Sequence, residues 1–107
     1  MHSLPAVVKL IPEFQHTYDQ MGANDPMAKE IDDAFLVLRE NAFAGHQVPK
    51  DKIAYWTAKY KVRNLYKYNL RNGNRLIYAI EKENGVPTVL VIVVFDHDTY
   101  LRKFGYE

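Results

Sequence analysis

The chain contains no cysteine among its 107 residues. Disulfide bridges, thiolate nucleophiles and zinc sites built on thiolates are therefore excluded. The longest apolar run, Val89–Phe95, is much too short to cross a bilayer. The N-terminus lacks the charged stretch followed by an apolar stretch that marks a secretory signal. We therefore expect a cytoplasmic protein without a membrane partner.

Motifs that identify common enzyme classes are also missing. The sequence has no glycine-rich phosphate loop, no Walker motif and no nucleophile elbow around a serine. Apolar residues make up 48% and charged residues 25%, as in an ordinary soluble domain. No repeat or linker divides the sequence. Residues 1–107 are therefore expected to form a single domain.

Acidic residues are nearly absent from one segment. Lys50–Arg75 holds eight of the fourteen Lys and Arg residues and a single acid, Asp51, whereas the segments before and after it are net acidic. Five aromatic residues lie among these bases: Tyr55, Trp56, Tyr60, Tyr66 and Tyr68. A basic strip with aromatic planes suits phosphates and unstacked bases. The alternative is that the aromatic residues belong to the core and the bases are simply solvated.

Hydrophobic periodicity predicts helices in the N-terminal half. Residues 6–10 are expected to form a first strand, and residues 12–22 a helix. A second helix begins with Asp25-Pro26 as its N-cap and first residue and ends near Asn41. Between residues 42 and 62 the pattern is mixed, and 51–60 fits a short helix.

After residue 62 the period changes to two. Three strands are predicted at 65–70, 75–80 and 88–95, joined by short turns that make them antiparallel. The last of them should be central, because its apolar run needs cover on both faces. The predicted fold class is α+β: a small antiparallel sheet in the order β-α-α-β-β-β, with two N-terminal helices packed on one face and a short C-terminal helix.

Two registers are open to the hairpin around Asn72-Gly73. A two-residue turn would pair Leu70 with Arg75 and mix polar and apolar side chains on both faces. A three-residue loop with Gly73 in the left-handed conformation pairs Leu70 with Asn74 instead. Only the second register collects the apolar side chains on one face, so we predict it. These side chains are Tyr66, Tyr68, Leu70, Leu76, Tyr78 and Ile80.

The predicted register has a consequence for function. Lys67, Asn69 and Arg75 then cluster on the opposite face of neighbouring strands. Two cations side by side on a sheet repel each other unless an anion lies between them. The cluster therefore outlines a phosphate site, and the alternative is a solvated outer face.

The residues after the last predicted strand add titratable groups beside this basic face. Asp96-His97-Asp98 is followed by Tyr100, which supplies an imidazole and a phenol. Alternatively, Asp96 or Asp98 caps a terminal helix and His97 lies in solvent. A metal site would need three or four converging ligands, and no further pair of ligands occurs at helical spacing. The other histidines, His2, His16 and His46, are expected at the surface.

The run Asn64–Tyr78, followed by an apolar strand, His97 and Tyr100, resembles toxins of the RelE/ParE superfamily from type II toxin–antitoxin modules. The resemblance covers the C-terminal half, and the predicted order of elements extends it over the chain. It implies a RelE-like fold. It also implies that Lys67 is the strand lysine of the RelE branch and that Arg75 is its phosphate-binding arginine. Arg71 then corresponds to a basic residue at the hairpin of that branch. Asn69 stands where the best-known member has a second lysine.

The resemblance implies an mRNA interferase, an endoribonuclease that cuts mRNA on the ribosome without metal or other cofactor, and a cognate antitoxin as partner. The ribose 2′-OH attacks the adjacent phosphate, which requires proton transfer and cations for the developing charge. Arg75 and Lys67 would supply the cations, and His97 would transfer a proton. Tyr100 would stack on the target nucleotide or orient it. Further RNA contacts are expected from Asn69, Arg71, Lys59, Lys61 and Arg63. The alternatives are a ParE-like gyrase inhibitor and a catalytically inactive RelE-fold binding protein.

Overall fold

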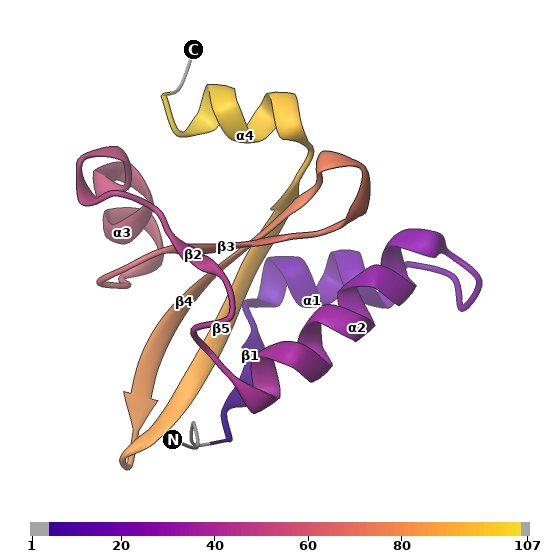
Figure 1. Cartoon of the computed structure of the whole chain (residues 1–107), viewed down its shortest axis with the longest axis horizontal. Helices are drawn as coiled ribbons and strands as arrows, with labels where there is room; N and C mark the ends of the chain where they lie inside the picture. Colours follow the sequence, from indigo (N-terminus) through magenta and orange to yellow (C-terminus); the bar gives the residue numbers. More distant parts are fainter. Residues whose placement is uncertain (1–4, 106–107) are drawn as a thin grey trace.

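The computed structural model describes residues 5–105, which form a five-stranded mixed sheet and four α-helices (Figure 1). The helices are α1 (Pro12–Asp19), α2 (Pro26–Glu40), α3 (Ala54–Tyr60) and α4 (His97–Lys103). The strands are β1 (Val7–Leu10), β2 (His46–Gln47), β3 (Tyr66–Asn69), β4 (Arg75–Glu83) and β5 (Val86–Phe95). Two short 3-10 turns occupy Lys50–Lys52 and Arg71–Gly73. Within the described part of the chain, no helix combines the length and apolar character needed to span a bilayer.

The strands lie in the order β1-β5-β4-β3-β2, and β1 runs parallel to β5 while the other neighbours are antiparallel. The prediction of a purely antiparallel sheet was therefore wrong. Short turns fix the directions of β3, β4 and β5, but no short turn connects β1 to its neighbour. The prediction that β5 is an interior strand buried on both faces is confirmed: it lies between β1 and β4 and contributes to both cores.

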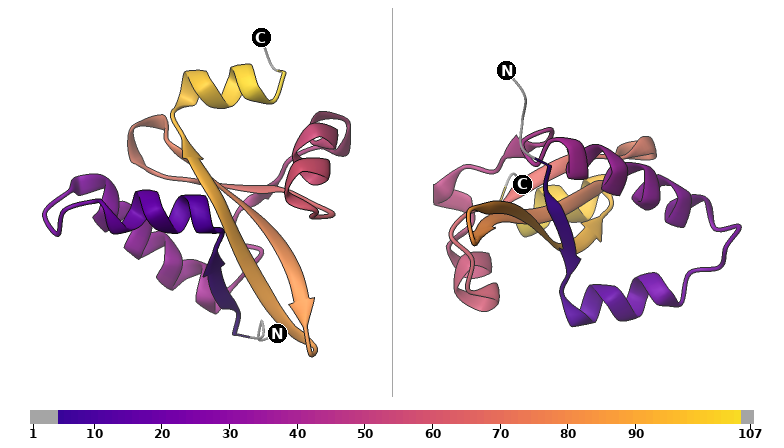
Figure 2. Two further views of the ribbon diagram at one scale, coloured as in Figure 1. Left: turned by 180° about the vertical axis from the view of Figure 1, so that it is seen from behind. Right: turned by 90° about the horizontal axis from the view of Figure 1, so that it is seen from below.

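Helices cover both faces of the sheet, not one as predicted (Figures 1 and 2). Leu76 and Tyr78 of β4 pack in one core with residues of α1 and α2, such as Phe14 and Ile31. The next residues along β4, Ile77 and Ala79, are equally buried in a second core with Trp56 of α3 and with Tyr100 and Phe104 at α4. An apolar run in a middle strand places hydrophobic side chains on both faces, and each face must be covered. The observed order, β-α-α-β-α-β-β-β-α, is therefore longer than the predicted one.

The predicted start of α2 agrees with its cap, whereas α1 ends at Asp19, before the predicted end at residue 22. The Asp25 carboxylate accepts a hydrogen bond from the Met27 backbone amide (2.8 Å), and Pro26 is the first residue of α2. Asp96 caps α4 by accepting from the Thr99 amide (2.7 Å), which is one of the alternatives open at the sequence level. These carboxylates satisfy amide groups that lack partners in the first turn of a helix.

The predicted three-residue hairpin loop is confirmed. Asn69 pairs with Arg75, and the Leu70 amide donates to the Asn74 carbonyl (2.8 Å). Gly73 is left-handed with φ 78°, and Asn72 is left-handed too, with φ 59°. Tyr66, Tyr68, Leu70, Leu76, Tyr78 and Ile80 pack together toward α1 and α2. The polar set of the same strands therefore points to the face that carries α3 and α4.

The buried hydroxyl of Tyr78 ties the loop after α2 to the sheet. It donates to the Ala42 carbonyl (2.9 Å) and accepts from the Gly45 amide (3.0 Å). A Cβ at Gly45 would lie 2.4 Å from the Lys67 carbonyl oxygen and 2.5 Å from the Tyr78 hydroxyl. Burial raises the pKa of the Tyr78 phenol to about 12. Gly45 therefore lets the chain lie directly against β3 just before β2 begins.

Candidate functional site

Two cations from neighbouring strands meet over one aromatic ring. The Lys67 ammonium lies 5.0 Å from the centroid of the Tyr100 ring, and the Arg75 guanidinium carbon lies 5.9 Å from it. Lys67 belongs to β3, Arg75 to β4 and Tyr100 to α4. Both distances are within the range of a cation–π interaction. The ring thus holds two like charges together on the α4 side of the sheet.

Among the described residues, no carboxylate balances these charges. Within residues 5–105, neither Lys67 nor Arg75 forms an ion pair. Burial, and secondly the charge of Arg75, lower the pKa of Lys67. Both effects mean that the protonated lysine is held at an energetic cost. An anion bound beside the pair would offset that cost.

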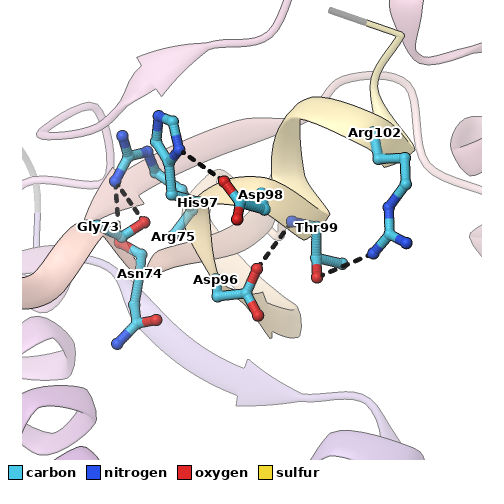
Figure 3. Close-up of polar contacts among 8 residues, drawn as sticks. All are labelled: Gly73, Asn74, Arg75, Asp96, His97, Asp98, Thr99 and Arg102. Carbon is cyan, nitrogen blue, oxygen red and sulfur yellow. Dashed lines mark hydrogen bonds and ion pairs between the residues drawn. The ribbon is translucent and has the colours of Figure 1, made fainter. Parts of the chain in front are cut away.

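The Arg75 guanidinium is incompletely satisfied by the protein. Its Nη1 donates to the carbonyls of Gly73 (2.8 Å) and Asn74 (3.3 Å), as Figure 3 shows. Its Nε is buried and has no hydrogen-bond partner among the described residues. A planar guanidinium with spare donors matches two oxygens of a phosphate.

His97 lies beside the same hairpin. It is the first residue of α4, and its side chain is about half exposed. A Cβ at Gly73 would lie 3.1 Å from the Cβ of His97, so the hairpin and the start of α4 are in close contact. Since the Gly73 carbonyl also binds Arg75, the imidazole and the guanidinium flank one backbone segment (Figure 3). The structure thus brings Lys67, Arg75, Tyr100 and His97 together.

The acidic neighbours of His97 have other surroundings. The Asp98 carboxylate lies 3.4 Å from Nδ1 of His97 and is 92% exposed. The carboxylate of Asp96 is engaged in the cap of α4, and the hydrogen bond from the Thr99 amide is the main cause of its lowered pKa. Across residues 5–105, no three His, Asp or Glu side chains gather as metal ligands would.

Tyr100 does not have the surroundings expected for a base-stacking residue. Only 2% of it is exposed, and its ring packs 5.0 Å from that of Phe104. A ring buried beneath Lys67 and Arg75 cannot stack on a nucleotide in this conformation. Its role here is to hold the two cations.

The other residues predicted to contact RNA do not form one strip. Asn69 is exposed and lies opposite Arg75, next to the site. Lys59 on α3 lies over the rings of Tyr55 and Tyr60, at 5.9 and 5.3 Å. Arg71 lines a groove with acidic residues of α2, and its amide donates to the Glu30 carboxylate (2.6 Å). Lys61 and Arg63 line a separate groove with Phe43 and Tyr66.

Most aromatic residues of the basic segment belong to the core. Trp56 is 6% exposed and stacks on Tyr60 and Phe104, at 6.1 and 5.3 Å. Tyr66 and Tyr68 are partly buried against the core of α1 and α2. Of the five, only Tyr55 is largely exposed, at 65%. The alternative that these aromatic residues build the core therefore holds for four of them.

One residue beside the site was missed by sequence reasoning. His46 is exposed, as predicted, and so is His16, whereas His2 lies outside the described residues. His46 pairs directly with Lys67 across β2 and β3. Paired residues of antiparallel strands point to the same face, so His46 stands on the face of Lys67 and Arg75. No local sequence pattern marks this two-residue strand, so nothing in the sequence signalled the position of His46.

Comparisons with known proteins do not identify relatives. No family model matches the chain, and neither curated proteins nor solved structures give a significant match.

Proposed function

We propose that this chain is a RelE-like toxin that cleaves mRNA on the ribosome. The supporting observation is the pair of Lys67 and Arg75 on one ring, without a carboxylate and next to the imidazole of His97. A phosphodiester supplies the anion that this pair lacks. Two cations for the developing charge and one proton-transfer group are then present in one place.

The reaction is attack of the ribose 2′-OH on the adjacent phosphate. The O2′–P bond forms, the P–O5′ bond breaks, and the products carry a 2′,3′-cyclic phosphate and a 5′-OH. Arg75 binds two non-bridging oxygens through its fork, and Lys67 adds a second charge as these oxygens become more negative. His97 transfers a proton, since imidazole can both accept and donate one near neutral pH.

The proposal includes a protein partner and a cytoplasmic location. A site with two uncompensated cations favours an acidic segment as a competitor for the RNA phosphate, and a cognate antitoxin would provide one. Its association with the toxin should slow as salt rises, because the attraction between exposed charges is screened.

The test is primer extension on mRNA in programmed ribosome complexes, with EDTA kept low enough to preserve ribosomes. The expected result is cleavage that leaves cyclic or 3′-phosphate ends. Inhibition of DNA gyrase without RNA cleavage would favour the ParE-like alternative. A lack of both activities would favour an inactive binding protein and would contradict the proposal.

A further inference from the structure

The edge strand β2 places a second imidazole beside the candidate site. We propose that His46 contacts the bound phosphodiester and is the second proton-transfer residue, acting together with His97. This inference rests on the proposed ribonuclease function and adds a catalytic residue to it.

The strand register carries the proposal. His46 and Lys67 are direct partners in the antiparallel pair of β2 and β3, and the next residue, Gln47, pairs with Tyr66 on the other face. Directly opposite residues in such pairs have Cβ atoms roughly 4.5–5.5 Å apart. The imidazole is exposed, so it can reach a phosphate held by Lys67.

The charged groups nearest to His46 in the sheet come from β3 and β4. β3 is the element that pairs with β2, and the titratable residue that it presents there is Lys67. Beyond Lys67 lie Tyr100 and Arg75, and His97 stands at the Arg75 end of the cluster. The two imidazoles therefore lie at opposite ends of the cation pair.

The position of β2 is fixed more firmly than its two residues alone would allow. The Tyr78 hydroxyl binds both Ala42 and Gly45 from inside the core, and the backbone of Gly45 lies directly against the Lys67 carbonyl. After β2, the Val48 amide donates to the Leu65 carbonyl (2.9 Å). Contacts on both sides thus hold His46 next to Lys67.

The chemistry requires two proton transfers. One group removes the proton of the 2′-OH as the O2′–P bond forms, and another donates a proton to O5′ as the P–O5′ bond breaks. The attacking O2′ and the leaving O5′ stand on opposite sides of the phosphorus, so an imidazole placed at one of them does not reach the other. Of the carboxylates nearest to His97, Asp96 caps a helix, and Asp98 is largely exposed and contacts the His97 imidazole itself (3.4 Å). His46 supplies the missing second group.

The experiment compares His46→Gln and His46→Asn with the wild type in single-turnover cleavage on ribosome complexes across a range of pH. The control is His16→Gln, which removes an exposed histidine from α1. We expect both His46 variants to lose about 10²-fold in rate and to lose one limb of the pH–rate profile, with ribosome affinity unchanged. Thermal melts confirm that the variants are folded.

A substrate with sulfur in place of O5′ separates the two roles, because a thiolate leaves without protonation. We expect this substrate to restore the rate of one of the two variants, His46→Gln or His97→Gln, and not of the other. His46→Gln with the wild-type rate and both limbs would overturn the inference and leave the ribonuclease function intact. A wild type that does not cleave RNA would overturn the proposed function itself.

Discussion

The phenolic oxygen of Tyr78 lies 3.0 Å from the amide nitrogen of Gly45, although 33 positions separate them in the sequence. Through this contact a buried side chain of the middle strand fixes the backbone that leads into β2. The side of the sheet that faces α1 and α2 therefore controls the position of His46 on the other side. The next three predictions test this contact.

Tyr78→Phe should lower the free energy of unfolding by about 1–3 kcal/mol, because the Gly45 amide and the Ala42 carbonyl lose their partner inside the protein. Urea denaturation measures the change. Tyr68→Phe is the control, since the hydroxyl of Tyr68 forms no hydrogen bond within residues 5–105. Equal stability of Tyr78→Phe and the wild type would show that the contact contributes little.

The same phenol predicts a loss of stability at high pH. Its folded-state pKa of about 12 lies above the ordinary value of 10.0. The stability gained from the neutral phenol is therefore complete below pH 10 and is lost as the pH rises through about 12. The full effect is about 3 kcal/mol, at 1.36 kcal/mol for each pKa unit. Urea denaturation between pH 9 and 12 should show a smaller decline for Tyr78→Phe, and parallel declines would contradict the prediction.

Gly45→Ala should destabilise the protein by about 1–3 kcal/mol, because its Cβ would overlap the Lys67 carbonyl and the Tyr78 hydroxyl. Gly22→Ala is the matched control, since a Cβ there meets nothing within 4 Å. The control should be neutral or slightly stabilising. Thermal denaturation of both variants measures the difference, and a Gly45→Ala protein as stable as Gly22→Ala would refute the close approach.

Lys67→Met should raise the free energy of unfolding while it removes RNA cleavage. Burial and Arg75 lower the pKa of Lys67, so the folded state binds this proton less tightly than the unfolded state does. Wild-type stability should consequently rise with pH toward the ordinary lysine value of 10.5, and the advantage of Lys67→Met should shrink over the same range. Lys29→Met, at an exposed position on α2, is the control. A less stable Lys67→Met protein at neutral pH would contradict this expectation.

Arg75→Ala should reduce cleavage more than Lys67→Ala does. Loss of a donor that stabilises developing charge costs roughly 10²–10³ in rate. The planar guanidinium can bind two phosphate oxygens at once, whereas the ammonium acts as a point charge. Single-turnover rates on ribosome complexes give the comparison, with Lys29→Ala as the control. The opposite order would assign the main charge stabilisation to Lys67.

Local chemistry explains which parts of the fold the sequence could predict. The hairpin register followed from apolar residues at alternate positions, because a one-residue slip would have exposed Tyr66, Tyr68 and Leu76. The start of α2 followed from Asp25-Pro26. In contrast, β2 has two exposed residues and no periodic pattern, so nothing local marked it. It is held by long-range contacts such as those of the Tyr78 hydroxyl with Ala42 and Gly45.

The candidate site could also be predicted only in part. Register alone placed Lys67 and Arg75 on one face, as the structure confirms. The burial of Tyr100 beneath them depends on how α4 packs against Trp56 and Phe104, and these contacts join segments far apart in the sequence. The cover on both faces of β4 was missed because Ile77 and Ala79 lie between residues that already satisfied a one-sided pattern.

The order of synthesis determines when α4 can cover Lys67 and Arg75. Lys67 and Arg75 leave the ribosome before β5 and α4, because these elements follow them in the chain. Until α4 folds, no Tyr100 ring holds the two cations together and no His97 stands beside the hairpin. The nascent chain thus exposes a basic hairpin first and completes the four-residue cluster last, so an acidic partner that meets it during translation can bind the cations before the cluster is assembled.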